Sequence, residues 1–288
     1  KESVYGSDMP DFMVWNQVKE LPFFWKPFYS FPAAVIGALL VPMAFALVFG
    51  FFAFRSRIKG VYFAIITQAL ALAAWLVFNR NDTNLGGTNG LTDFKQVLGY
   101  RLSEPGTQRA LYVITVLCLG ASYLLCQWII RSRAGRVLVA VRDSEKRVVF
   151  SGYTPANYKL FVFVVSAGLA GLAGLLYAPQ VGIITPAQIG VLPSLEMVIW
   201  VAVGGRGSLA GAVIGAVSVN YGRSVLTNYF PELWPFMLGG LFVLVVLLFP
   251  DGMVGMIRKG KDLLTRRKAG EEKPIVPNQK VVVPEGKR

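Results

Sequence analysis

The sequence has no histidine and only two cysteines in 288 residues. Without histidine, the chain cannot build a Ser-His-Asp or Cys-His nucleophile system, and no imidazole is available to hold a metal ion. Cys118 and Cys126 share one apolar run, where a helix would separate them by about 12 Å, too far for a disulfide. We therefore expect no catalytic residue and no metal site in this chain.

Charged residues are also scarce, at 16%, whereas 54% of the residues are hydrophobic. The mean hydropathy is +0.52, and such values with several unbroken apolar runs are typical of integral helical membrane proteins. In a soluble protein, the net charge of +13 would indicate nucleic acid. Here Lys and Arg gather beside the apolar runs, so we assign them to topology and anionic lipid, and predict no nucleic-acid partner.

The apolar runs predict an all-α, polytopic helical membrane protein: a bundle with a glycine-interrupted or re-entrant helix pair near the C-terminal half. Runs of about 20 residues are long enough to cross a hydrocarbon core of ~30 Å. We expect an external or interfacial segment over 1–30, a membrane domain over 31–250, and a partly disordered, basic cytoplasmic tail over 251–288. The expected spans are 31–54, 61–78, 110–130, 160–178, 195–221 as a broken pair, and 234–250.

The loop between two of these spans, residues 131–159, is rich in cations. It carries Arg131, Arg133, Arg136, Arg142, Lys146, Arg147 and Lys159 against Asp143 and Glu145. This excess of Lys and Arg places the loop on the cytoplasmic side. Apolar residues flank the charged run, and Gly152 and Pro155 would end any helix. We predict a short amphipathic helix closed by a glycine turn at the membrane surface; the alternative is a solvated basic loop.

The segment 195–221 decides the topology. The basic turn Arg55–Lys59, the central loop and the tail are all inside only if residues 1–30 lie outside and this segment crosses twice or forms a re-entrant hairpin. Glycines interrupt its apolar halves, a pattern typical of transporter cores. Glu196 and Arg206 lie beside the break, either as gate or packing charges or as ordinary helix-end charges.

Thr67 and Gln68 lie near mid-depth of the span 61–78. A glutamine at that depth requires a polar partner or a wet cavity. Together with Glu196 and Arg206, they are the candidate residues of a translocation pathway.

Small residues at helical spacing mark helix contacts, because they let two backbones approach closely. Gly171 and Gly174 each follow an alanine four residues earlier, and Gly207, Gly211 and Gly215 form a continuous GxxxGxxxG pattern. We predict helix packing at all five glycines.

The segment Gly255–Asp262, GMIRKGKD, comes close to a nucleotide-binding P-loop. Asp262 stands where a Ser or Thr would bind magnesium, and the segment follows a membrane span rather than a strand. The sequence therefore shows no motif for ATP hydrolysis. If the protein pumps a solute, a partner must hydrolyse the nucleotide.

Three separate stretches carry a family resemblance. The stretch GRVLVAVRDSEKRVVFSGYTPANYKLFVFVVSAGLAGLAGLLYAPQVG resembles the corresponding segment of branched-chain amino acid ABC transporter permeases (LivM-like). The stretches VYFAIITQALALAAWLVFNRNDTNLGGTNGLTDFK and EMVIWVAVGGRGSLAGAVIGA resemble, more narrowly, urea ABC transporter permeases (UrtC type). The resemblance covers roughly Leu21 to Met256.

This resemblance implies a permease subunit in a bacterial inner membrane, with further spans before Lys1. It also implies four kinds of partner: a second permease, two cytoplasmic ATPases that bind ATP and Mg²⁺, a periplasmic urea-binding protein, and membrane lipid. Residues 142–152 would be the helix and turn that contact the ATPase, with Arg142, Asp143, Glu145 and Gly152 as coupling residues. No cofactor is expected in this chain.

Three functions stay open at this point. The one we favour on the sequence is an ATP-driven importer for urea or short amides, and the alternative is an importer for branched-chain amino acids. The third is an ion-coupled transporter or channel that acts alone. The third predicts relays of charged residues inside the spans, and the interiors of the clear spans contain none.

Overall fold

The computed structural model describes residues 22–229 except 24, 57, 59, 82–86, 93 and 206, together with a few isolated residues: 13, 236, 237, 239, 240, 243, 252 and 255. The chain divides into two compact units, Lys1–Glu196 and Met197–Arg288. Most of the expected first segment, most of the last span over 234–250, nearly all of the tail, and Arg206 lie outside the described residues.

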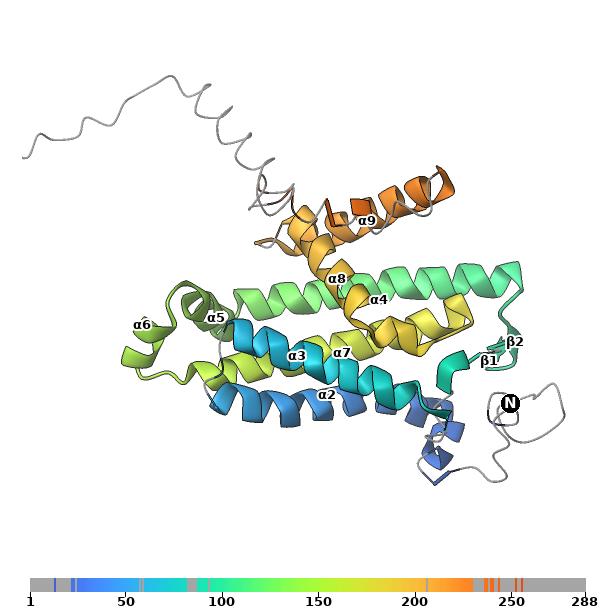
Figure 1. Ribbon diagram of the computed structural model, residues 1–288, viewed down its shortest axis with the longest axis horizontal. Coiled ribbons are helices and arrows are strands. Elements are labelled where there is room, and N and C mark those ends of the chain that lie inside the picture. Colours follow the sequence, from blue (N-terminus) through green and yellow to red (C-terminus); the bar gives the residue numbers. More distant parts are fainter. Residues whose placement is uncertain are drawn as a thin grey trace, which may run out of the picture. The chain divides into compact units, whose positions relative to one another are not determined.

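The first unit is built on four long apolar helices (Figure 1): α2 (Phe31–Arg55), α3 (Val61–Phe78), α4 (Pro105–Arg131) and α7 (Pro155–Val181). Each is long and apolar enough to cross a membrane, which confirms the predicted fold class. Compared with the expected spans, α4 and α7 each begin five residues earlier, at a proline. Proline suits a first helical turn, and a spanning helix can continue beyond the hydrocarbon core.

Two shorter helices, α5 (Arg133–Asp143) and α6 (Glu145–Phe150), join α4 to α7. The sequence predicted a single helix here, and that prediction is wrong. Ser144 adopts an extended backbone, with φ −161° and ψ 95°, which ends one helix and begins the next. The segment is therefore helical rather than a solvated loop, but it forms two helices instead of one.

Two loops meet at the other end of the first unit (Figure 1). One carries the turn η3 (Gly87–Asn89) and a small hairpin of β1 (Gln96–Val97) and β2 (Tyr100–Arg101), and the other carries η4 (Pro186–Ile189). Backbone hydrogen bonds link them, from the Leu91 N–H to the Ile184 carbonyl at 2.7 Å and in reverse at 2.8 Å. The two loops therefore share an end that lies opposite α5 and α6.

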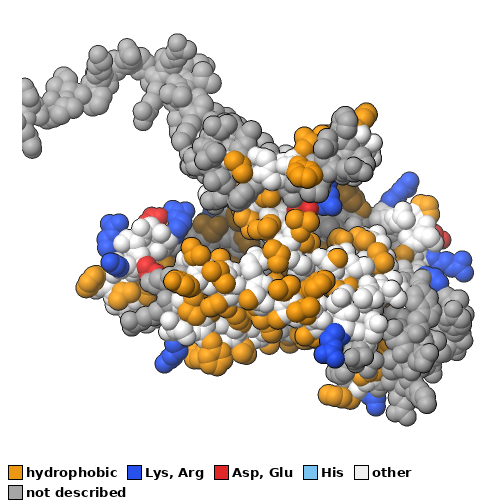
Figure 2. Space-filling view, in the orientation of Figure 1, with side chains coloured by type: hydrophobic (Ala, Val, Ile, Leu, Met, Phe, Trp, Pro, Cys, Tyr) orange, Lys and Arg blue, Asp and Glu red, His pale blue; other side chains and the backbone are white. Residues whose placement is uncertain are grey.

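Helices α2 and α7 form the best-packed pair of this unit. A Cβ at Gly171 would collide with the Ala38 carbonyl oxygen, and one at Gly50 would stand 2.9 Å from Leu160 Cδ1. Close backbone approach of this kind strengthens van der Waals packing between membrane helices. Figure 2 shows apolar side chains over the middle of the unit, with Lys and Arg at its two ends, as a bilayer requires.

Helix α8 (Val191–Gly204) and helix α9 (Leu209–Tyr229) are the predicted broken pair. The break contains Gly205, whose φ is +125°, and Ser208, whose Oγ accepts a 2.8 Å hydrogen bond from the Gly211 N–H. Within the second unit, Ile199, Ala202, Val203 and Val219 form a small apolar cluster, with Trp200 packed against it. Helix α9 is long enough to cross a membrane, whereas α8 is shorter.

Candidate functional site

The residues from Ser132 to Thr154 form an ordered element, which we call the helical loop. It begins at a sharp joint: the Ser132 hydroxyl donates to the Ile129 carbonyl at 2.6 Å and accepts from the Gly135 N–H at 3.2 Å. A Cβ at Gly135 would collide with the carbonyls of Ile129 and Ile130. Glycine at this position therefore allows α5 to fold back tightly against the end of α4.

An ion pair and a glycine turn fix the other half of the helical loop. Glu145 Oε1 lies 2.9 Å from Lys159 Nζ, which ties the start of α6 to α7. After α6, Gly152 has φ +83°. Its N–H donates to the Val149 carbonyl at 3.0 Å, and the next N–H donates to the Val148 carbonyl at 3.3 Å. This is a Schellman motif, which caps the helix end.

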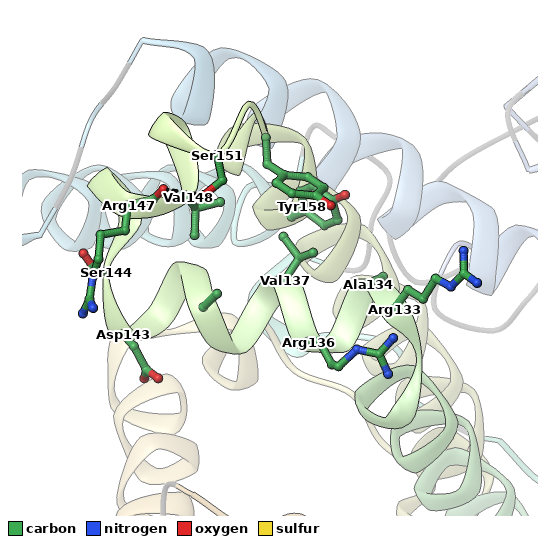
Figure 3. Close-up of a pocket in the computed structure, with 12 residues that line it drawn as sticks. Arg133, Ala134, Arg136, Val137, Asp143, Ser144, Arg147, Val148, Ser151 and Tyr158 are labelled. Atoms are coloured by element: carbon green, nitrogen blue, oxygen red, sulfur yellow. Dashed lines mark hydrogen bonds between the residues drawn. The ribbon is translucent and has the colours of Figure 1, made fainter.

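A groove of about 800 Å³ separates α5 from α6 (Figure 3). Apolar side chains of Val137 and Val148 point into it, and Tyr158 of α7 lies beside them. Its cationic lining residues are Arg133 and Arg136 from α5 and Arg147 from α6. Among the described residues, none of these three guanidinium groups has a carboxylate within 4.0 Å. The lining also includes Asp143, which pairs with Arg142, so the groove carries more cations than carboxylates around its apolar residues.

The structure gives different tasks to the four predicted coupling residues. Arg142 and Asp143 end α5 and pair with each other at 3.0 Å, with both side chains more than half exposed. Glu145 instead turns inward to α7, and Gly152 closes α6. The four thus belong to one element but form no single cluster.

Sequence reasoning missed two residues that matter for the helical loop, one in α7 and one in α6. Lys159 was counted only as a cation, although it holds Glu145. Phe150 is 91% exposed at the end of α6. A phenylalanine next to a run of cations, outside any apolar span, was a readable signal for it.

The predicted pathway residues do not gather at one place. The Thr67 hydroxyl donates to the Ala64 carbonyl at 2.9 Å, within α3. The neighbouring Gln68 Oε1 is buried, and no described residue donates a hydrogen bond to it. Glu196 is 9% exposed in α8, and Arg206 lies outside the described residues.

The predicted packing glycines divide into two groups. Gly171 lies against the α2 backbone, and Gly211 and Gly215 lie against Gly204 near the end of α8. At Gly174 and Gly207, by contrast, no described atom lies within 4 Å of where a Cβ would stand. The structure does not show the predicted contact at these two positions, because no described helix covers them.

A second groove, of about 500 Å³, lies between α4 and α7. Its lining includes several leucines from both helices, with Cys118 and Ser122 among its smaller residues. At one end, Gln180 Nε2 donates to Thr115 Oγ1 at 2.6 Å. This hydrogen bond joins the two long helices through their side chains.

Several apolar spanning helices, a glycine-broken helix pair and a basic, ordered loop at one end define a multi-pass membrane protein of the transporter kind. Residues 12–246 match the family described as "Branched-chain amino acid transport system / permease component". The chain belongs to this family, and it is accordingly a transport permease component of the inner (plasma) membrane rather than an enzyme.

Curated relatives agree with this assignment. The chain is 27% identical over 238 residues to the high-affinity branched-chain amino acid transport system permease protein LivM of Salmonella typhimurium, covering 75% of this chain and 56% of that protein. It is 32% identical over 152 residues to BraD of Pseudomonas aeruginosa, covering 51% and 47%.

A probable LivM of Methanocaldococcus jannaschii is 26% identical over 246 residues, covering 78% of this chain and 70% of that protein. The match to LivM of Salmonella typhimurium and to BraD thus spans about half the length of each of those proteins. No solved structure matches the chain.

Proposed function

We propose that the chain is a membrane subunit of an ATP-binding-cassette importer, and that cytoplasmic ATPases drive it through the helical loop. The observation that supports this is the attachment of the helical loop at both ends. The Ser132 joint fixes it to α4, and the ion pair between Glu145 and Lys159 fixes it to α7. A displacement of the helical loop would therefore reach two helices of 27 residues each.

This proposal assigns the ATP chemistry to other subunits. The near P-loop at Gly255–Asp262 lies almost entirely outside the described residues and lacks the Ser or Thr that binds magnesium. The complete importer would contain a second permease, two ATP-binding subunits that carry ATP and Mg²⁺, and a periplasmic substrate-binding protein. Membrane lipid would surround the permease pair.

For the cargo, we propose a branched-chain amino acid, because the LivM and BraD relatives are named for that transport. The narrower resemblance of two stretches to urea permeases keeps urea or a short amide as the second candidate. None of these three relatives is named for urea. In either case, much of the selectivity would reside in the periplasmic binding protein.

Gln68 is the strongest candidate for contact with the cargo. A buried carbonyl oxygen that lacks a hydrogen bond costs about 1–3 kcal/mol, and Gln68 Oε1 has no donor among the described residues. The ammonium of an amino acid, an amide N–H of urea, or water would each satisfy it. The Thr67 hydroxyl, by contrast, already donates a hydrogen bond to the Ala64 carbonyl.

The test is reconstitution of the complete complex with its binding protein in proteoliposomes, measuring ATP-dependent uptake of labelled leucine and labelled urea in parallel. Gly152→Val should lower uptake at least about fivefold, because a β-branched residue is strained at a positive φ. Gly99→Val is the matched control, because Gly99 has φ +84° in the hairpin of β1 and β2 and has open space around it.

The outcomes separate the candidates. Leucine uptake without urea uptake supports the proposed cargo, and the reverse result replaces it with urea. Unchanged uptake in Gly152→Val and Glu145→Gln together would contradict the coupling role of the helical loop. Transport by the purified chain without ATPases would show an independently acting transporter instead.

A further inference from the structure

The end of α6 presents a large apolar side chain to solvent. Phe150 is 91% exposed and Val149 is 55% exposed, although both lie in the helical loop rather than in a spanning helix. Exposed apolar residues scattered along α2 or α4 are explained by lipid. Phe150 is different, because it is the last residue of α6 and lies before the turn that leads to α7, outside any spanning helix.

Helical geometry places Phe150 between two cations. Successive residues of a helix are about 100° apart, so Glu145 and Val148 point to one side of α6, and Lys146, Arg147 and Phe150 to the other. The structure agrees: Val148 is 6% exposed and Glu145 bonds to Lys159 on the inner side, whereas the side chains on the outer side are exposed.

Phe150 is also held in a fixed position. The Schellman motif at Gly152 caps the end of its helix, and the ion pair at Glu145 fixes the beginning. A side chain whose backbone is already ordered loses less conformational entropy when it binds a partner. Aromatic residues, phenylalanine included, and arginine are enriched in protein interfaces, and a few such side chains carry most of the binding energy.

We propose that Phe150 is the anchor by which the helical loop engages its ATPase, inserting into an apolar pocket whose rim is acidic. The charge of the flanking residues, Lys146 and Arg147, requires a rim of opposite sign. The inference rests on the proposed function and deepens it, since it names the contact residue and the chemistry of the partner surface.

The groove between α5 and α6 has a separate position. Its floor contains Val148 from the inner side of α6, whereas Phe150 is on the outer side and does not line it. Arg147 lies at the boundary and lines the groove. Phe150 and the groove are therefore separate features of the helical loop.

The first experiment replaces Phe150 with the photoreactive residue p-benzoylphenylalanine in the complete complex. Illumination should crosslink this position to the ATPase subunit. A matched probe at Tyr100, which is 66% exposed in the outer hairpin, should give no ATPase crosslink. Crosslinks from position 150 that go only to lipid, or only to another part of this chain, would overturn the proposal.

The second experiment measures how tightly the purified ATPase binds the detergent-solubilised permease pair. Phe150→Ala should weaken binding about tenfold or more, the effect expected for an interface hot spot. Phe150→Leu should keep most of the affinity, and Tyr100→Ala should leave it unchanged. The thermal stability of Phe150→Ala should equal that of the wild type, because the side chain is exposed.

The third experiment tests the charge of the two residues that flank Phe150. Replacing both Lys146 and Arg147 with Glu should weaken ATPase binding and invert its dependence on salt. If the wild-type complex transports cargo with ATP and Phe150→Ala binds the ATPase normally, the anchor is refuted while the importer stands. If the wild-type complex shows no ATP-driven uptake, the proposed function itself fails.

Discussion

Helices α7 and α4 are alike in sequence terms and differ in how they are used. Both have 27 residues, start at a proline and are apolar enough to span a membrane. Yet α7 lies along α2 with Gly168 buried, whereas α4 has no buried residue in the described structure. Trp128, Leu124 and Leu117 of α4 are each at least 66% exposed.

The difference shows what anchors a membrane helix within its own chain. Apolarity does not, because lipid is as apolar as a leucine side chain. Small residues do: Gly171 brings the α7 backbone against Ala38, whereas Gly120 of α4 has open space around it. Helix α4 is fixed mainly at the end that joins α5 and through Thr115, and much of its surface is exposed within the described structure.

The contrast between α7 and α4 predicts its largest effect at Gly171. Gly171→Leu forces a side chain into the Ala38 carbonyl. We expect the free energy of unfolding to fall by about 3 kcal/mol or more, because the obstacle is backbone rather than a flexible side chain. Gly174→Leu, one turn along the same helix, should leave the stability of the chain nearly unchanged. Thermal unfolding of the two variants in detergent checks this, and equal destabilisation would break the contrast.

The same rule applies to the broken pair in the second unit. A Cβ at Gly215 would stand 2.7 Å from the Gly204 nitrogen, so Gly215→Leu should cost about 2–3 kcal/mol. Hydrogen exchange should show the loss of protection in α8 and α9. Gly222→Leu in α9 meets open space and serves as the control; an equal effect there would argue against the packing.

Aromatic packing between α7 and α2 predicts a smaller loss of stability than the glycine contacts do. Phe163 of α7 lies 5.8 Å from Phe54 and 6.2 Å from Phe49 of α2, measured between ring centroids. Phe163→Ala should destabilise the unit by about 2 kcal/mol, because the vacated volume is only partly refilled. Leu124→Ala on the exposed surface of α4 should cost less than about 0.5 kcal/mol. Denaturant titration of both variants would test the ranking.

The smallest effect is expected at the joint between α4 and α5. Ser132→Ala removes the side-chain cap of α5 and should cost about 1 kcal/mol. The amide of Gly135, which donates to Ser132 Oγ, should then exchange faster, with α4 unaffected. Ser151→Ala, which removes only a hydroxyl bonded to the Arg147 carbonyl, is the control. Unchanged exchange at Gly135 would show that the glycine alone sets the joint.

The sequence predicted the spanning helices well because hydropathy reports directly on the solvent around a helix. Helix α3 has the predicted bounds, Val61–Phe78. The starts of α4 and α7 were missed because their polar first turns lie outside the apolar window. The split between α5 and α6 was missed because Ser144 lies inside a charged run, where helix propensity gives no clear break.

The candidate site was predicted in part, and for a definite reason. Charge and glycine mark the helical loop in the sequence, but the partner of Glu145 is a long-range contact that no local pattern reveals. Likewise, the same small-residue spacing marks both Gly171 and Gly174. Only the position of α2 in space decides which of them is covered.

The bridge between Leu91 and Ile184 has a consequence for movement at the end of the first unit that lies opposite α5 and α6. Two backbone hydrogen bonds are worth about 0.5–1.5 kcal/mol each, so this bridge is weak enough to open by thermal fluctuation. While it is closed, it holds the loop between α3 and α4 against the loop that follows α7. Opening of this bridge would therefore release the two loops from each other while the helical loop at the far end keeps its own contacts.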